Sequence, residues 1–286
     1  MSSGAGQAFT ANTVCDKHDC PADPYAWTLK ESMIRLAFLF SVSIALRLEY
    51  LIAKYMVGRM APDWSQNKVR IFTVRVVSFT HALFSSLGCL TSLFVDPNFV
   101  RDTYDYKSYS AHYVFLFAMG YFIYDLTDMY IHGELSNSKE YLVHHSLVLT
   151  AFSVILYTGK LFGFAMIGLL VEVQTIFLHL RTMIRLIRSP KKSSTAYNAL
   201  VNANMACLFL FRHVPVTYLL YVMLVQDEKT PAVLRTFLIG GLGFLTYHNL
   251  HLTTAMVKAD GFFGYETQTL DEDHVDPLGP VKVKKA

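Results

Sequence analysis

The sequence contains few charged residues. Of its 286 residues only 16% are Asp, Glu, Lys or Arg, whereas a soluble globular domain carries about 25%. Hydrophobic residues make up 53% of the chain, so too few polar side chains are available to cover a water-soluble domain. The composition also disfavours a disordered chain, which combines low hydrophobicity with high net charge, because the net charge here is only +3.

Cysteine and targeting signals are scarce as well. Four cysteines are too few for a disulfide scaffold. The first 31 residues lack a basic segment followed by a hydrophobic one, so we expect no cleavable signal peptide. No segment repeats at a fixed period. These absences favour a protein whose solvent is a lipid bilayer.

Long hydrophobic runs are what the sequence does have. A membrane-spanning helix needs roughly 20 mostly apolar residues to cross about 30 Å of hydrocarbon. The continuous runs favour helices over a barrel of short alternating strands. We therefore predict an all-α, polytopic membrane protein with about seven transmembrane helices, at residues 33–53, 76–95, 108–130, 141–159, 161–180, 201–226 and 236–257. Residues 33–53 are the weakest of these and would otherwise form an interfacial helix.

The basic residues predict how these helices are oriented. With the N-terminus outside, the inner connections and the C-terminal segment hold fourteen Lys and Arg, and the outer connections hold six. Basic residues favour the cytosolic side of a membrane. We therefore expect residues 1–31 to be a polar extracellular or lumenal tail, residues 32–57 to contain the first transmembrane helix, and residues 263–286 to be a cytosolic tail.

The two tails carry further signals. Cys15 and Cys20 in the N-terminal tail form a disulfide loop, remain unpaired thiols, or bind a metal together with His18, and the sequence leaves all three open. At the C-terminus, Lys282 and Lys284 have the spacing of a dilysine retrieval signal. This signal makes the endoplasmic reticulum one candidate location.

Ionisable residues inside predicted spans are costly and usually face a partner or a cavity. Asp125 and Asp128 end one span, and His144 and His145 begin the next. Asp125 and His145 are equally far along the chain from the turn between the two helices, and so are Asp128 and His144. All four residues therefore lie at one depth. The two histidines point about 100° apart, so only one faces the aspartates and the other reaches another helix or a cavity.

Three interpretations of this cluster stay open: a polar link between helices, a lipid-binding or chemical site, and metal ligation. In a chemical site, a carboxylate fixes the imidazole tautomer for proton transfer or acyl chemistry. We expect no bound metal, because His at i and i+4 with a third ligand is absent. We also expect no cofactor and no nucleic-acid partner, since the basic residues follow the inner membrane face.

Depth also places Glu172 beside Arg212, near the middle of the membrane. We predict a buried ion pair between them, because two charges in hydrocarbon persist only when paired and hydrogen-bonded. Four further features have simpler interpretations: a kink at Pro215, hydrogen bonds between helices from Asn202 and Asn204, interfacial or core positions for His248 and His251, and close helix packing at Gly240, Gly241 and Gly243.

Four motifs together resemble the TLC domain family, closest to its subgroup of TLC domain-containing proteins 1 and 2. They are GYFIYDLTDM at residues 120–129, EYLVHH at 140–145, LVEV with FLHLR at 170–181, and FLFRHVPVTYL at 209–219. The likeness covers about residues 64–262. It implies six helices around a lipid-sized cavity, with one extra helix before them.

The resemblance also implies a function. Members of the subgroup regulate membrane fluidity by limiting the incorporation of long-chain polyunsaturated fatty acids into phospholipids, at the plasma membrane. Ceramide synthases share the domain and are acyltransferases with a histidine pair on one helix and two aspartates on the next. His144 and His145 match the histidines, but Glu172 and Thr175 stand where the aspartates would be, which argues against ceramide synthesis.

Three functional hypotheses follow. The first is a regulator of phospholipid acyl composition that holds membrane phospholipids or acyl lipids in its cavity. The second is an acyltransferase in which His144 or His145 carries or deprotonates the acyl acceptor. The third is a trafficking adaptor of the endoplasmic reticulum that depends on the basic C-terminal tail.

Overall fold

A computed structural model describes residues 28–136, 139–187 and 195–265, and all regular structure in these ranges is helical. The long helices are α1 (Leu29–Met60), α2 (Gln66–Val95), α4 (Tyr109–Ile131), α5 (Lys139–Thr158), α7 (Val171–Ile187), α8 (Thr195–Leu208) and α10 (Ala232–Ala259). The shorter elements are α3 (Asn98–Arg101), α6 (Phe162–Gly168), α9 (Val214–Tyr221), the π-helical segments η2 (Phe209–His213) and η3 (Val222–Gln226), and the 3-10 turn η4 (Phe262–Gly264).

Six helical segments of the described chain are long and apolar enough to cross a membrane. They are Leu29–Met60, Gln66–Val95, Tyr109–Ile131, Lys139–Thr158, Phe162–Ile187 and Thr195–Gln226. The predicted class, an all-α polytopic membrane protein, is confirmed. The seventh predicted span lies in α10, which has 28 residues but is not among the six, because its C-terminal half is rich in polar side chains such as His248, Asn249 and His251.

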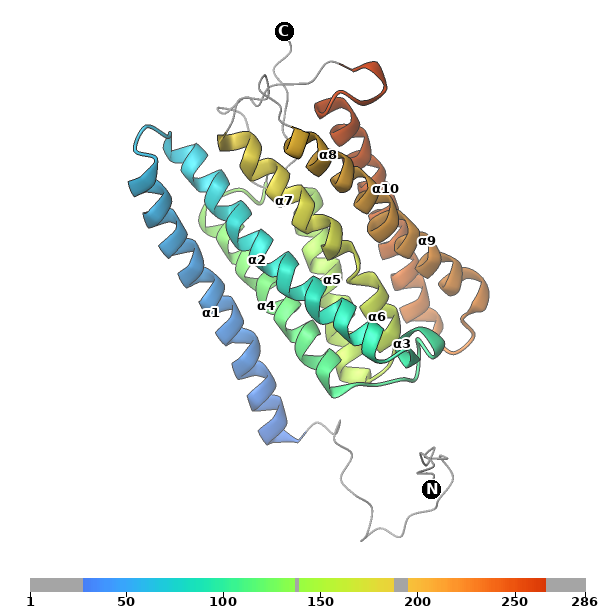
Figure 1. Cartoon of the computed structure of the whole chain (residues 1–286). Coiled ribbons are helices and arrows are strands. Elements are labelled where there is room, and N and C mark those ends of the chain that lie inside the picture. The colour runs from blue at the N-terminus through green and yellow to red at the C-terminus, as the bar shows by residue number, and fades with distance from the viewer. Residues whose placement is uncertain (1–27, 137–138, 188–194, 266–286) are drawn as a thin grey trace, which may run out of the picture.

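The helices form a closed ring with one helix outside it. Around the ring, α2 contacts α4, α4 contacts α5, α5 contacts α10, α10 contacts α9, α8 contacts α7, and α7 contacts α2. Helix α1 packs against α2 and α4 from outside and lies at one edge of the bundle in Figure 1. The outer face of α1 exposes large apolar side chains, including Phe40, Ile44 and Leu48, as expected for a helix that faces lipid.

Local signals explain where several helices begin and turn. Thr28 caps α1 by accepting a hydrogen bond from the Glu31 N–H, and Ser65 caps α2 in the same way from Lys68, both at 3.2 Å. At the corner between α5 and α6, Gly159 and Leu161 have positive φ angles of 65° and 63°. A Cβ atom at Gly163 would lie 2.0 Å from the Phe99 carbonyl oxygen, so only glycine allows α6 to approach α3 here.

Two of the spans are interrupted, and both interruptions border the same cavity. The fifth span breaks between α6 and α7, at Leu169 and Leu170. The sixth contains η2, in which the Val214 N–H donates to the Phe209 carbonyl five residues earlier. Pro215 follows directly and lacks an N–H donor for the Phe211 carbonyl. The sequence predicted a kink at Pro215, and the structure has a π-helical segment directly before it.

Candidate functional site

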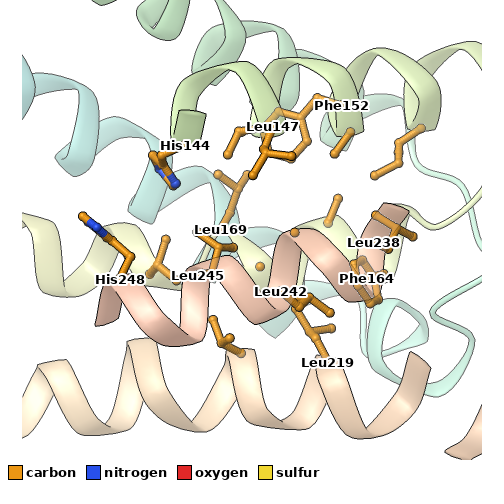
Figure 2. A pocket seen from close by; sticks show the side chains of 18 of the residues that line it. His144, Leu147, Phe152, Phe164, Leu169, Leu219, Leu238, Leu242, Leu245 and His248 are labelled. Carbon is orange, nitrogen blue, oxygen red and sulfur yellow. The ribbon is translucent and has the colours of Figure 1, made fainter. Parts of the chain in front are cut away.

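An apolar cavity lies inside the ring of helices. The empty space between its walls is about 1030 Å³, part of which is open to the surroundings. Its walls come from α5, α6, α7, η2, α9 and α10, with Phe122 added from α4. In Figure 2, α5 and α10 face each other across it.

The two ends of the cavity differ in chemistry. One end holds the polar residues that line it: His144, Glu172, Arg212, His248 and Asn249. The other end is closed by apolar side chains, among them Phe152, Phe164 and Leu238, and Figure 2 shows Phe164 and Leu238 far from the two histidines. A cavity with one polar end and an apolar remainder matches the division of an acyl lipid into a polar group and a hydrocarbon chain.

The two neighbouring histidines of α5 point to different places. The His145 Nδ1 atom lies 3.5 Å from the Asp125 Oδ2 atom, and both side chains are buried. His144 instead lines the cavity, and its ring stacks on that of His248 at 6.2 Å. The expected division is therefore present: one imidazole meets an aspartate of α4, and the other reaches the cavity.

The predicted ion pair between Glu172 and Arg212 is wrong. Both residues are described and both line the cavity, but the two side chains do not form an ion pair. Arg212 donates to the Thr175 hydroxyl at 2.9 Å, and Glu172 lies 3.8 Å from His81 of α2. Depth predicted the level of both residues, but the break before α7 turns Glu172 toward α2, and the π-helical segment turns Arg212 toward Thr175.

His248 is buried, in keeping with a core position, but it and His251 also share an acidic neighbour. Glu140 Oε2 of α5 lies 3.4 Å and 3.7 Å from their Nδ1 atoms. The interpretation of the glycines needs correction. The glycines of α10 do not make close helix contacts. A Cβ atom at Gly240 or Gly243 would meet nothing within 4 Å, and one at Gly241 would meet only Leu147, at 4.0 Å.

Gly241 has a different role, since it forms part of the cavity wall. The absence of a side chain leaves space in the middle of the cavity, on the side of α10 that faces Leu147 of α5. Gly240, the preceding residue, is exposed on another face of the helix. These two glycines therefore offer a matched pair for testing the cavity.

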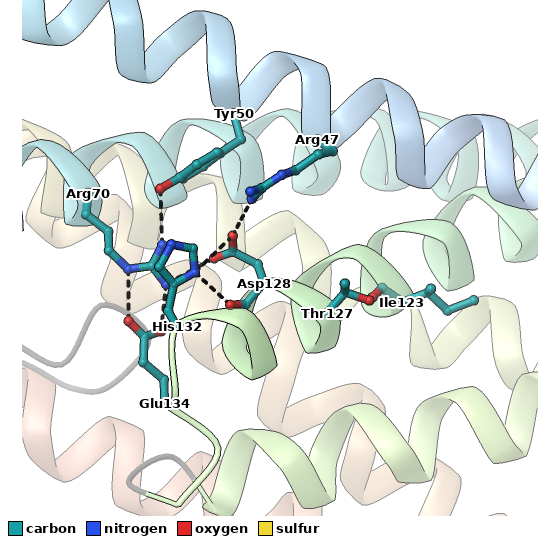
Figure 3. A network of polar contacts seen from close by, with 8 residues as sticks. All are labelled: Arg47, Tyr50, Arg70, Ile123, Thr127, Asp128, His132 and Glu134. Carbon is teal, nitrogen blue, oxygen red and sulfur yellow. Dashed lines mark hydrogen bonds and ion pairs between the residues drawn. The ribbon is translucent and has the colours of Figure 1, made fainter.

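Asp128 belongs to a different network, at the end of the bundle where α1, α2 and α4 meet (Figure 3). Its carboxylate accepts from Arg47 at 2.7 Å and from Arg70 at 3.0 Å. Arg70 also donates to both oxygens of Glu134 and to the Tyr50 hydroxyl. This network ties the outer helix to the ring, whereas the polar link predicted from the sequence joined the aspartates to His144 and His145.

His81 is the cavity neighbour that the sequence interpretation missed. It lies in α2, is 1% exposed, and stacks on Tyr121 with ring centroids 3.8 Å apart. The run at residues 76–95 contains no Asp, Glu, Lys or Arg, and His81 is its one ionisable imidazole. A single histidine within an otherwise uncharged span is the signal in the sequence that indicates this residue. The hydrogen bond from Gln174 to Asn204, at 2.9 Å, confirms the predicted link between helices at Asn204.

At the opposite end of the bundle from Asp128, a cluster of charged residues holds three loops between helices together. Asp105 accepts from Lys160 and Lys229, both at 2.6 Å, and the Tyr104 hydroxyl donates to the Lys229 carbonyl at 3.1 Å. Hydrogen bonds from the two lysines hold the pKa of Asp105 below its usual value. Three connections are joined here, those before α4, before α6 and before α10.

The described residues contain no group of three or more His, Cys, Asp or Glu side chains arranged to hold a metal ion. Cys15, Cys20 and His18 lie outside the residues that the structure describes, as do Lys282 and Lys284. The predictions for the two tails stay predictions.

Fold and cavity together define a polytopic helical membrane protein with an internal apolar pocket. The chain belongs to the TLC domain family, since the family's model matches residues 71–258. It is 34% identical to TLC domain-containing protein 1 of Gallus gallus over 182 residues, which are 64% of this chain and 68% of the relative. It is 28% identical to TLC domain-containing protein 2 of Danio rerio over 64% of this chain and 74% of the relative. It is 31% identical to TLC domain-containing protein 1 of Homo sapiens over 65% of this chain and 73% of the relative.

Proposed function

We propose that the protein binds the acyl chain of a membrane lipid in its cavity and thereby regulates the acyl composition and fluidity of the membrane. In this role it limits the incorporation of long-chain polyunsaturated fatty acids into phospholipids, in keeping with the subgroup that its motifs resemble. One observation carries the proposal: the cavity has a polar end at His144 and Arg212 and an apolar end at Phe164 and Leu238.

The test is to fill the cavity without disturbing its polar end. In cells that lack the protein, we expect wild type to restore the phospholipid acyl profile measured by lipid mass spectrometry. Gly241→Leu places a side chain in the middle of the cavity, about 10 Å from His248 along α10 at 1.5 Å per residue. This variant should fail to restore the profile.

Gly240→Leu is the matched control, because it adds the same side chain to the same helix on an exposed face where nothing lies within 4 Å. It should restore the profile as wild type does, at equal amounts of protein in the membrane. Full restoration by Gly241→Leu would contradict a role for the cavity.

His144 supports a second candidate, an acyltransferase. It lines the cavity beside Glu172 and Arg212, where its imidazole could take the proton from the hydroxyl or amine of an acceptor as that atom attacks the carbonyl of an acyl thioester. The acyl–sulfur bond would break, and the leaving thiolate would take up the proton.

Purified protein offered acyl-CoA with lysophospholipid or a sphingoid base distinguishes the two candidates. Transfer that is lost in His144→Ala would favour the acyltransferase. Absence of transfer to every acceptor, together with full restoration of the cellular profile by His144→Ala, would favour regulation by binding. His145→Ala probes the other member of the pair, which contacts Asp125 rather than the cavity.

We also propose the plasma membrane as the site of action, with the endoplasmic reticulum as the alternative. Replacing Lys282 and Lys284 by Ala should leave the distribution of the protein between these membranes unchanged. A shift from the endoplasmic reticulum to the cell surface would favour retrieval by the dilysine signal and the adaptor hypothesis.

A further inference from the structure

The polar end of the cavity contains two opposite charges that do not neutralise each other directly. Glu172 is 7% exposed and lines the cavity, and its Oε2 atom has no hydrogen-bond partner among the described residues. The Nη2 atom of Arg212 donates a hydrogen bond to the Thr175 hydroxyl. The Nε atom of Arg212 has no hydrogen-bond partner among the described residues. The Nδ1 atom of His144, which also lines the cavity, has no partner in this part of the chain either. The charged residues therefore offer an unsatisfied acceptor on Glu172 and an unsatisfied donor on Arg212, beside a free ring nitrogen of His144.

The neighbouring side chains add no further net charge beside Glu172 and Arg212. Glu172 has His81 at 3.8 Å, and Glu140 lies beside His248 and His251 rather than beside Arg212. With the histidines neutral, the charges that line the cavity sum to zero. An extra anion in this enclosed space would have no counter-charge of its own, and an unpaired charge in an apolar interior is costly.

From these contacts we infer that the cavity selects a lipid whose polar group carries no net charge but has both a hydrogen-bond donor and an acceptor. The donor, a hydroxyl or an amine, meets the Glu172 carboxylate. The acceptor, a carbonyl or another oxygen of the polar group, meets the Arg212 Nε–H. A polar group of this kind satisfies both buried atoms at once, whereas a purely anionic one satisfies Arg212 and repels Glu172.

This inference rests on the proposed function, since it assumes that the cavity holds an acyl lipid. Beyond that function, it specifies the net charge of the polar group of the lipids that bind. The two sources of such a polar group are an uncharged glycerol ester and a zwitterionic phospholipid, so the experiment includes both.

The test compares three probes with the same oleoyl chain: monoacylglycerol, which is uncharged; lysophosphatidylethanolamine, which is zwitterionic; and lysophosphatidic acid, which is anionic. Full-length protein in a non-ionic detergent is incubated with each probe, and the retained lipid is quantified by mass spectrometry. At least one of the first two probes should bind at least about tenfold more tightly than the anionic probe. Which of the two binds identifies the source.

Glu172→Gln removes the negative charge with little change of shape and leaves Arg212 uncompensated. In this variant the preference should fall or reverse, with lysophosphatidic acid bound more tightly than by wild type. Glu228→Gln is the matched control, because Glu228 is an exposed residue before α10 that does not line the cavity. It should keep the wild-type preference.

Equal binding of the anionic and the net-neutral probes by wild type would overturn the inference while leaving the proposed function in place. Failure of all three probes to bind wild type would contradict the proposed function itself, and the inference with it. Size-exclusion chromatography checks whether Glu172→Gln folds. If it does not fold, the comparison of the three probes on wild type still tests the inference. If that variant folds and keeps the wild-type preference, Glu172 does not set the selectivity.

Discussion

Asp125 and Asp128 are one helical turn apart on α4, yet they serve different parts of the molecule. Asp125 lies beside His145 of α5, inside the ring, whereas Asp128 joins α4 to Arg47 and Arg70 of α1 and α2. Spacing along the sequence predicted the common depth of the acids and the histidines. It could not predict the partners of Asp128, because these come from helices far away in the sequence.

The Asp128 network gives a prediction about stability. The Asp128 side chain is 4% exposed and contacts two guanidinium groups. Asp128→Ala therefore removes the carboxylate that Arg47 and Arg70 share. Because Arg47 is 35% exposed and Arg70 keeps Glu134, we expect a loss of about 1–3 kcal/mol in the free energy of unfolding. Glu134→Ala, at a side chain that is 17% exposed, should cost only about 1 kcal/mol, because Arg70 keeps Asp128.

Thermal unfolding of the two variants in detergent measures this difference. Wild type and both variants are compared at the same protein and detergent concentrations. If Glu134→Ala proves as destabilising as Asp128→Ala, Asp128 is not the centre of the link between α1 and the ring.

Among the helices, the interrupted sixth span matters most for the site. Seven hydrophobic runs predicted the helices, and the six spans together with α10 correspond to them. The interruptions were harder to predict, since a break such as the one between α6 and α7 depends on packing against other helices. Pro215 was the exception, because proline removes a backbone donor in any helix.

Pro215→Ala should convert η2 into regular α-helix. An alanine restores the N–H donor and allows regular α-helical hydrogen bonding, so thermal stability should stay the same or rise. Loss of the π-helical segment rotates the residues before it by about 100° relative to those after it. Arg212 then leaves the polar end of the cavity, and the amount of lipid retained by the purified protein should fall.

Thermal unfolding and lipid mass spectrometry on the same preparations separate the two effects. A variant of unchanged stability that retains as much lipid as wild type would show that η2 does not position Arg212 for binding.

The charge cluster at Asp105 predicts a pH dependence. Two lysines lower the pKa of this carboxyl, so its contribution to stability is fully present above the ordinary carboxyl pKa of about 3.9 and is lost as pH falls through the lowered value. Because the groups are exposed, Asp105→Asn should lower the melting temperature by no more than about 4 °C at neutral pH.

The difference in melting temperature between wild type and Asp105→Asn should be constant near neutral pH and shrink as the pH falls below about 3.9. Melting curves from pH 7 to pH 3 check this sign. A difference that grows toward acid pH would contradict the assignment of Asp105 as an ionised partner of Lys160 and Lys229.

For the whole molecule, the basic residues predict that the N-terminus is outside the membrane and the C-terminus inside. In a background without the four native cysteines, Glu228→Cys should react with a membrane-impermeant maleimide applied to intact cells. Lys258→Cys, near the other end of α10, should react only after the membrane is permeabilised. The reverse pattern would invert the predicted orientation.

Composition and hydrophobic runs were enough to predict the class of the molecule, and the order of the motifs was enough to predict its family. The cavity itself could not be predicted from composition, because its walls come from segments spread between Phe122 and Asn249. Gly241 illustrates the limit. In the sequence a glycine-rich run suggests close packing, and only the arrangement of α5 and α10 shows that one of these glycines keeps a cavity open.

The central claim is that this cavity holds an acyl lipid. Native mass spectrometry of the purified protein tests it most directly, on wild type, Gly241→Leu and Gly240→Leu prepared from the same cells. The account predicts bound acyl lipid on wild type and on Gly240→Leu, and loss of most of it from Gly241→Leu. Equal lipid on all three proteins, or none on wild type, would contradict it.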